Sequence, residues 1–258
     1  GLAQPRWRLT DLRAVCPAFA EYSLAGLSQA LRRLGVRRHR GRLGIHRPDP
    51  DYTAKLAAID AALALARAQP EAVSLVYADE FILTRQPTLA AVWAAQGTEP
   101  VARLSQRSTT RWRISGALDA VTGRVTTHAA ARMGVAELGR FLRRLRAAYP
   151  DRRLILVWDT WPVHRHPAVL AVAAELGIEL RWLLTDAPWT NPIEKLWRWV
   201  KQAMLHHHRQ ADQWEALKDQ VAAFLDQFAE GSAALLRYVG LLPESDEAVV
   251  AAHGPTKL

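Results

Sequence analysis

The chain has 258 residues, half of them hydrophobic, with 34 Lys and Arg against 25 Asp and Glu and a net charge of +9. Such a length provides one sizeable core with room for a small appended module. The apolar stretches are too short for a transmembrane helix, no apolar signal-peptide core opens the sequence, and the single cysteine, Cys16, excludes an internal disulfide. These features predict a soluble cytoplasmic protein without membrane attachment, in which Cys16 is a small buried residue.

The excess of positive charge comes mainly from arginine. A positive surface attracts polyanions, because binding releases the counterions of the phosphates, and the arginine fork suits bidentate phosphate contact. An Arg- and Ala-rich composition can also reflect a GC-rich coding sequence. The charge by itself favours a nucleic-acid partner.

Residues 1–47 are predicted to form a helix-turn-helix module that binds DNA. Thr10 can cap a short helix, and a second helix begins at Ser23, carries an apolar stripe of leucines and stops at Gly35. The polar side of this second helix and the basic arm after it supply the predicted DNA contacts, which are Ser28, Gln29, Arg32, Arg33, Arg37, Arg38, Arg40, Arg42 and Arg47. A solvated basic face on an ordinary helical hairpin is the alternative.

Residues 48–70 are predicted to be a proline-bent linker and a connecting helix that starts at Asp51. After this helix the pattern changes to short apolar runs that alternate with amphipathic ones. Strands are expected at 73–78, 112–118, 124–128, 154–158 and 178–183, and helices at 135–148, 167–176 and from 191 onward. The order βββαβαβα predicts an α/β domain at 71–242, with a mixed sheet and flanking helices, before a tail at 243–258.

Three acidic residues lie where two apolar strands and a helix would present them. Asp79 follows the first predicted strand, Asp159 follows the fourth, and Glu194 lies in the first turn of a helix for which Asn191 is the expected N-cap. A crossover helix returns the fourth strand next to the first, so the two aspartates are expected to meet at the strand ends. Each acid taken singly also fits a turn or a capping box. Together they predict a divalent-metal site that acts on phosphodiesters.

This arrangement resembles the ribonuclease-H-like nucleotidyl transferases, and three motifs narrow the resemblance. They are Asp79-Glu80, Asp159 followed five positions later by His164, and the block Asn191-Pro-Ile-Glu-Lys-Leu-Trp197. Thirty-four residues lie between Asp159 and the glutamate of that block. The combination resembles the mariner superfamily of DDE transposases, and most of all its bacterial insertion-sequence branch.

The resemblance implies a DNA transposase that cleaves transposon ends and transfers the freed strand into target DNA by cut-and-paste, at TA sites in this superfamily. Asp79, Asp159 and Glu194 would hold two Mg²⁺ ions, with Mn²⁺ as a substitute. The implied partners are double-stranded DNA, as terminal inverted repeats and as target, and a second copy of the chain in a homodimer on DNA. The implied location is the bacterial cytoplasm, in association with the nucleoid.

Residues around the three acids are expected to support them or to touch DNA. Glu80, His164 and Asn191 are the expected supporting residues. The expected DNA contacts near the site are Trp189, Thr190, Lys195, Arg198 and Lys201. Trp197 is interpreted as a core residue, and the segment His206 to His208 is expected to contact DNA or solvent at a helix end.

The chain departs from the family pattern in two places. Thr160 stands where the family usually has Asn after the second Asp, which predicts different hydrogen bonding around Asp159. Family members normally carry two helix-turn-helix units, and residues 1–47 resemble the second, so the first is expected to be absent. Two other functions stay open: a DNA-binding regulator or domesticated transposase that keeps the fold without cutting, and a ribonuclease-H-like nuclease without strand transfer.

Overall fold

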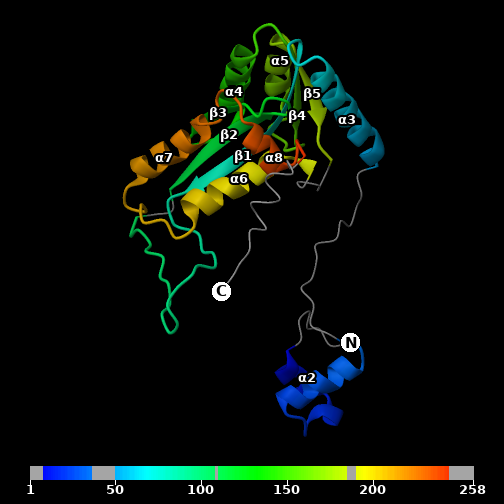
Figure 1. Cartoon of the computed structure of the whole chain (residues 1–258), viewed down its shortest axis with the longest axis vertical. Coiled ribbons are helices and arrows are strands. Elements are labelled where there is room, and N and C mark those ends of the chain that lie inside the picture. The colour runs from blue at the N-terminus through cyan, green and yellow to red at the C-terminus, as the bar shows by residue number, and fades with distance from the viewer. Residues whose placement is uncertain (1–7, 37–49, 108–109, 185–189, 244–258) are drawn as a thin grey trace, which may run out of the picture. The chain divides into compact units, whose positions relative to one another are not determined.

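The computed structural model describes residues 8–36, 50–107, 110–184 and 190–243. It contains two compact units, Gly1–His46 and Arg47–Leu258 (Figure 1). Six of the predicted DNA contacts lie outside the described residues, namely Arg37, Arg38, Arg40, Arg42, Arg47 and Trp189.

The first unit is a small helical module. It consists of α1 (Leu9–Val15), a 3-10 turn at Pro17–Phe19 and α2 (Leu24–Arg33). The Ser23 side chain accepts a hydrogen bond from the Gly26 N–H at 3.1 Å and so caps α2, and Gly35, at φ 77°, follows the end of this helix, as the sequence predicted.

Two details of this module differ from the predictions. The residue that precedes α1 is Arg8 rather than Thr10, and its N–H donates to Asp11 Oδ2 at 2.8 Å. The side chain of Asp11, three positions on, therefore accepts the N–H of the cap residue, which is a different contact from the cap predicted for Thr10. Cys16 is half-buried rather than buried, because it lies in the short connection after α1.

The second unit is built on a mixed five-stranded sheet of order β3-β2-β1-β4-β5. The strands are β1 (Val73–Thr84), β2 (Arg111–Asp119), β3 (Val125–Ala130), β4 (Arg153–Trp158) and β5 (Ile178–Trp182). The central strand β1 pairs antiparallel with β2 and parallel with β4. The predicted fold class and the predicted neighbourhood of the first and fourth strands are both confirmed.

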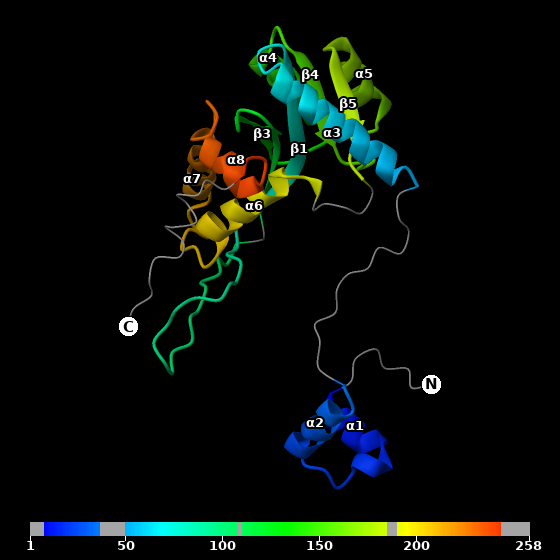
Figure 2. The ribbon, with the colours of Figure 1, turned by 45° about the vertical axis from the view of Figure 1, so that its right-hand side comes forward.

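Helices cover both faces of this sheet (Figure 2). One face packs against α3 (Tyr52–Ala68), α6 (Ile193–Val200), α7 (Trp214–Asp226) and α8 (Ala233–Val239). The other face packs against α4 (Val135–Ala148) and α5 (Pro167–Glu175). Two apolar clusters result, one on each side of the central strands, and their close packing holds these strands in place.

Alternation along β1 assigns its side chains to the two faces. Leu75, Tyr77 and Phe81 belong to the cluster with α6, whereas Val76 and Ala78 belong to the cluster with α4. Position 79 therefore lies on the α6 side of the sheet, and position 80 lies on the opposite side.

The first strand is longer than predicted, and Asp79 lies inside it rather than at its end. β1 continues to Thr84, because the apolar residues after Glu80 pair with the first residues of β2. In this register Asp79 stands opposite Gly116. A π-helical turn at Lys201–Leu205, which the sequence did not indicate, follows α6 directly.

In the described part of the chain, no helix is both long enough and apolar enough to cross a membrane.

Candidate functional site

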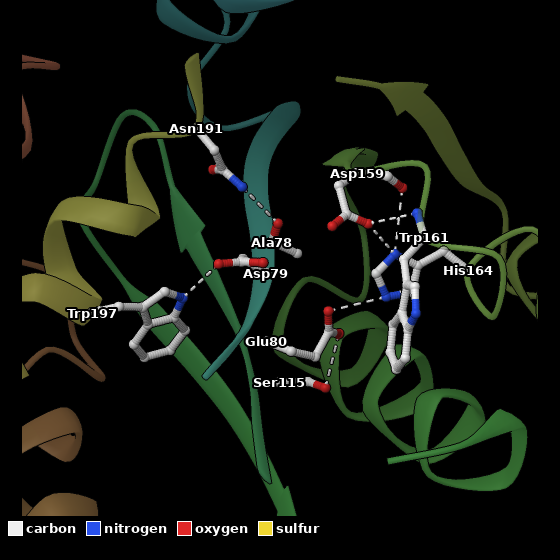
Figure 3. A network of polar contacts seen from close by, with 9 residues as sticks. All are labelled: Ala78, Asp79, Glu80, Ser115, Asp159, Trp161, His164, Asn191 and Trp197. Carbon is white, nitrogen blue, oxygen red and sulfur yellow. Dashed lines mark hydrogen bonds and ion pairs between the residues drawn. The ribbon is translucent and has the colours of Figure 1, made fainter. Parts of the chain in front are cut away.

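The parallel pairing of β1 with β4 brings two of the predicted acids together. The last pair of this register is Tyr77 with Val157, and Asp79 and Asp159 each follow it by two residues, so both aspartates lie close to the same end of the pairing. Figure 3 shows both carboxylates in one network of polar contacts. Asp159 Oδ1 accepts the hydrogen bonds from the loop that follows β4. In Figure 3 the other carboxylate oxygen, Oδ2, points toward the side on which Asp79 lies.

Glu194 comes to the same region from α6, where it occupies the first helical turn. Asn191 does not cap this helix, since Pro192 holds the cap position without a side-chain hydrogen bond. The buried amide of Asn191 instead donates from Nδ2 to the Ala78 carbonyl at 2.9 Å. This contact fixes the start of α6 beside the residue that precedes Asp79.

The carboxylates are close enough to perturb one another. Burial raises the pKa of Asp79 to about 7, and the negative charges of Glu194, Glu80 and Asp159 add to this rise. Asp159 and Glu194 therefore both lie within electrostatic range of Asp79. Negative charge gathered around a buried carboxylate is costly without a compensating cation.

His164 supplies one positive partner. It is fully buried, its Nδ1 donates to Asp159 Oδ1 at 2.6 Å, and its Nε2 lies 3.1 Å from Glu80 Oε2. Burial lowers the pKa of His164, but the hydrogen bonds to Asp159 and Glu80 outweigh it and raise this pKa to about 9. The imidazole is thus protonated at neutral pH and ties the end of β4 to β1.

The surroundings of His164 keep it in place. Its ring stacks on Trp158 with centroids 3.7 Å apart, and Trp161 meets it edge-on at 5.2 Å. Glu80 is held from its other side, where its Oε1 accepts the Ser115 hydroxyl at 3.2 Å. Of the three residues expected to support the acids, His164 contacts Asp159, Glu80 contacts His164, and Asn191 contacts the strand that carries Asp79.

The loop after β4 shows how Asp159 is held without the family's asparagine. The Trp161 N–H donates to Asp159 Oδ1 at 2.9 Å, so the backbone supplies the contact rather than Thr160. Burial would raise the pKa of Asp159, but the hydrogen bonds from His164 and Trp161 hold it below its usual value. Asp159 is therefore ionised at neutral pH.

The donor set fits a hard divalent cation. Three carboxylates offer oxygen ligands of the kind that Mg²⁺ and Mn²⁺ prefer, and a cation between them would relieve the repulsion that raises the pKa of Asp79. As they stand, no three or more His, Cys, Asp or Glu side chains among the described residues lie so that they could hold a metal ion. Closing the carboxylates on an ion therefore requires side-chain movement.

The predicted DNA contacts fall on both units. On α2, Gln29, Arg32 and Arg33 are exposed and Ser28 is half-buried. On and after α6, Arg198 and Lys201 are exposed, and Lys201 lies over the Phe81 ring at 5.7 Å. Lys195 donates to the Val239 carbonyl at 2.8 Å and so links α6 to α8, and Thr190 is half-buried.

Two sequence interpretations miss what the structure contains. Trp197 is a core residue, as interpreted, but it also donates its indole N–H to Asp79 Oδ2 at 3.0 Å, which the interpretation missed. The sequence signal for this contact was the position of Trp197 three residues after Glu194, because residues at this spacing lie on the same face of a helix. His206 and His207, expected to face DNA or solvent, instead contact the segment after β1: His206 Nδ1 lies 2.9 Å from Thr88 Oγ1, and His207 Nε2 lies 2.9 Å from the Ala90 carbonyl.

A family model described as DDE superfamily endonuclease matches residues 74–218, which is more than half of the chain. The chain belongs to this family. The match contains Asp79, Asp159 and Glu194. The predicted resemblance to DDE enzymes is confirmed by this match, and the chain is also similar to a bacterial insertion-element protein and, in fold, to a mariner transposase.

A curated relative of this DDE endonuclease is the uncharacterized 39 kDa protein of insertion element IS630 from Shigella sonnei, 25% identical over 172 residues. The match covers 66% of this chain and 49% of that protein, so the chain spans about half the length of the relative. Among solved structures, the Mos1 mariner paired-end complex with Mn has a TM-score of 0.60 at 19% identity, over 100% of this chain and 82% of that one. The Mos1 paired-end complex with the left transposon end has a TM-score of 0.59 at 18% identity, over 98% and 80%. These likenesses show a shared fold.

Replacement of Asp79 by asparagine is expected to stabilise the metal-free protein at alkaline pH. Because the pKa of Asp79 is about 7 in the folded chain and 3.8 is its ordinary value, its contribution to stability is fully present below pH 4 and is lost as the pH rises through 7. At pH 8 the free energy of unfolding of Asp79→Asn should exceed that of the wild type by on the order of 1–3 kcal/mol, and the difference should shrink toward pH 4.

Urea unfolding at pH 4 and pH 8 in the presence of EDTA measures this difference. Glu175→Gln, an exposed carboxylate on α5, is the matched control and should have little effect at either pH. If Asp79→Asn had a lower free energy of unfolding than the wild type at pH 8, the prediction that the Asp79 charge destabilises the metal-free fold would be contradicted.

Proposed function

We propose that this DDE endonuclease is a DNA transposase that cleaves transposon ends and joins them to target DNA. The observation that carries the proposal is the gathering of Asp79, Asp159 and Glu194 from β1, β4 and α6, with a charge coupling that raises the pKa of Asp79. The net charge of +9 supports a polyanionic substrate around this acidic centre. The family membership and the relative from an insertion element support the same assignment.

The three carboxylates are proposed to hold two Mg²⁺ ions, with Mn²⁺ as a substitute. When bound, the ions supply Lewis acidity at the scissile phosphate and favour deprotonation of the attacking hydroxyl. The chain's own residues set the geometry: His164 and Trp161 orient Asp159, and Asn191 anchors the helix that carries Glu194. The Mos1 paired-end complex with Mn, and a further Mos1 paired-end complex with Mg, support the choice of ions.

The proposed chemistry consists of two displacements at phosphorus. In the first, a water oxygen attacks the phosphate at the transposon end, the bond to the 3′ oxygen breaks, and a 3′ hydroxyl is released. In the second, this hydroxyl attacks a phosphate of the target DNA, at TA sites, and the target strand's own P–O3′ bond breaks. No covalent enzyme intermediate is involved, so no nucleophilic side chain is required.

The proposed partners are double-stranded DNA, as terminal inverted repeats and as target, and a second copy of the chain bound to the other transposon end. The exposed polar side of α2 is proposed to read the repeat, and exposed residues of the α6 region, Arg198 and Lys201, are proposed to contact DNA near the acids. The proposed location is the bacterial cytoplasm, in association with the nucleoid.

Neutral replacements of the three acids test the proposed catalysis. Asp79→Asn, Asp159→Asn and Glu194→Gln should each lower Mg²⁺-dependent cleavage of a transposon-end duplex by more than about 100-fold, since even residues that only support metal ligands cost 10–100-fold. Duplex binding should be largely retained, because the positively charged side chains that bind phosphates are all still present. Gel-resolved cleavage and fluorescence anisotropy measure the two quantities.

Glu175→Gln should cleave like the wild type. Near-normal cleavage by any one of the three acid variants would remove that residue from the ligand set. A wild type that binds the duplex without cutting it would favour the DNA-binding regulator, and a preference for RNA–DNA hybrids would favour the ribonuclease-H-like nuclease.

Replacement of Arg32 and Arg33 by alanine tests DNA recognition by α2. Both side chains are exposed in the last turn of this helix, so the replacement should weaken phosphate binding without damage to the module. The slope of log affinity against log salt concentration should become shallower by about 0.9 for each phosphate that the variant no longer neutralises. Arg8→Ala with Arg13→Ala, on and beside α1, removes the same charge from the other helix.

Equal changes of slope in the two double variants would contradict a specific role of α2, because they would reflect net charge alone.

A further inference from the structure

The hydrogen bond from Trp197 to Asp79 connects two of the elements that carry acids. The indole Nε1–H donates to Asp79 Oδ2 at 3.0 Å, and the tryptophan side chain is only 2% exposed. Trp197 lies three residues after Glu194 on α6, which places both side chains on the same face of the helix. One helix therefore presents a carboxylate and an N–H donor together toward β1.

Packing on two sides holds the indole in this position. The Phe81 ring stacks on it, with centroids 5.3 Å apart and an interplanar angle of 21°. Gly116, the cross-strand partner of Asp79, leaves the space that the ring fills: a Cβ at this position would lie 2.6 Å from Cη2 and 2.8 Å from Cζ2 of Trp197. β2 therefore carries glycine at position 116, where a larger side chain would displace the indole of Trp197.

Burial alone does not account for the pairing with a carboxylate. Trp158 is equally buried, yet within the part of the chain that the structure describes its indole N–H has no hydrogen-bond partner. The chain thus tolerates an unpaired buried indole, whereas the N–H of Trp197 is directed at a carboxylate oxygen. Hydrogen bonds to ionised acceptors are stronger than those between neutral groups, so this contact strengthens when Asp79 is ionised.

We propose that Trp197 is a positioning residue for Asp79. Its N–H holds Oδ2 and turns the other carboxylate oxygen, Oδ1, toward the side on which Asp159 lies. In Figure 3 the Asp79 carboxylate lies between the Trp197 indole and Asp159. The inference rests on the proposed function, because it concerns the orientation of a carboxylate that is proposed to bind metal. α6 would then have two roles: it carries Glu194, and through Trp197 it orients Asp79.

Metal affinity distinguishes this role from simple packing. Trp197→Phe keeps an aromatic ring against Phe81 but removes the donor, so the dissociation constant for Mn²⁺, measured by electron paramagnetic resonance without DNA, should rise about tenfold or more. Trp199→Phe is the matched control on the same helix, since its ring packs against Phe224 and Tyr238, away from Asp79. This control should leave Mn²⁺ affinity unchanged while it lowers stability.

The indole proton gives a readout that needs neither metal nor activity. In ¹H–¹⁵N spectra of the metal-free protein, the Nε1–H resonance of Trp197 should lie downfield and should move upfield in Asp79→Ala, where its acceptor is gone. The Trp199 resonance should stay in place. This comparison tests the hydrogen bond even where Trp197→Phe fails to fold.

An unmoved Trp197 resonance in Asp79→Ala, or wild-type Mn²⁺ affinity in a folded Trp197→Phe, would overturn the positioning role. A wild type that binds no Mn²⁺ would overturn the proposed function instead, so the two failures are distinguishable.

Discussion

The structure depends on the parallel pairing of β1 with β4, because Asp79 on β1 and Asp159 in the loop after β4 each lie two residues beyond its last pair, Tyr77 with Val157. Asp79 and Asp159 then share a region with Glu80 and Glu194, and burial together with these charges raises the pKa of Asp79 to about 7. A fold selected for stability alone would avoid this arrangement. The repulsion is the physical reason to expect a divalent cation among these carboxylates.

Because side chains alternate along β1, the adjacent residues Asp79 and Glu80 make their contacts on opposite faces of the sheet. Asp79 faces α6 and receives the indole N–H of Trp197, whereas Glu80 faces the opposite side and meets His164 and Ser115. His164 also holds Asp159, so the charged imidazole connects the second acid to β1 from one side while the indole fixes the first acid from the other. Two adjacent residues of one strand thus link the acids to both halves of the core.

Much of the fold was predictable from the sequence. Short apolar runs indicate the strands, and the crossover rule places the fourth strand beside the first. The mixed sheet, its flanking helices and the adjacency of the first and fourth strands are confirmed. The predicted length of β1 was wrong. The residues after Glu80 belong to the strand because they pair with β2, and no local sequence pattern indicates this pairing. Trp197 was missed for a similar reason: a buried tryptophan looks like core until the acceptor of its N–H is known. The histidines at 206 and 207 contact a distant segment, and such contacts leave no periodic signal.

The central claim is that Asp79, Asp159 and Glu194 together hold the metal. The most direct measurement is a crystal structure of the chain soaked with Mn²⁺, with anomalous diffraction used to locate the ions. We expect anomalous density bounded by these three carboxylates, with Trp197 still donating to Asp79 and His164 still contacting Asp159. Anomalous density at other residues only, or a bound ion that one of the three acids does not touch, would contradict this claim.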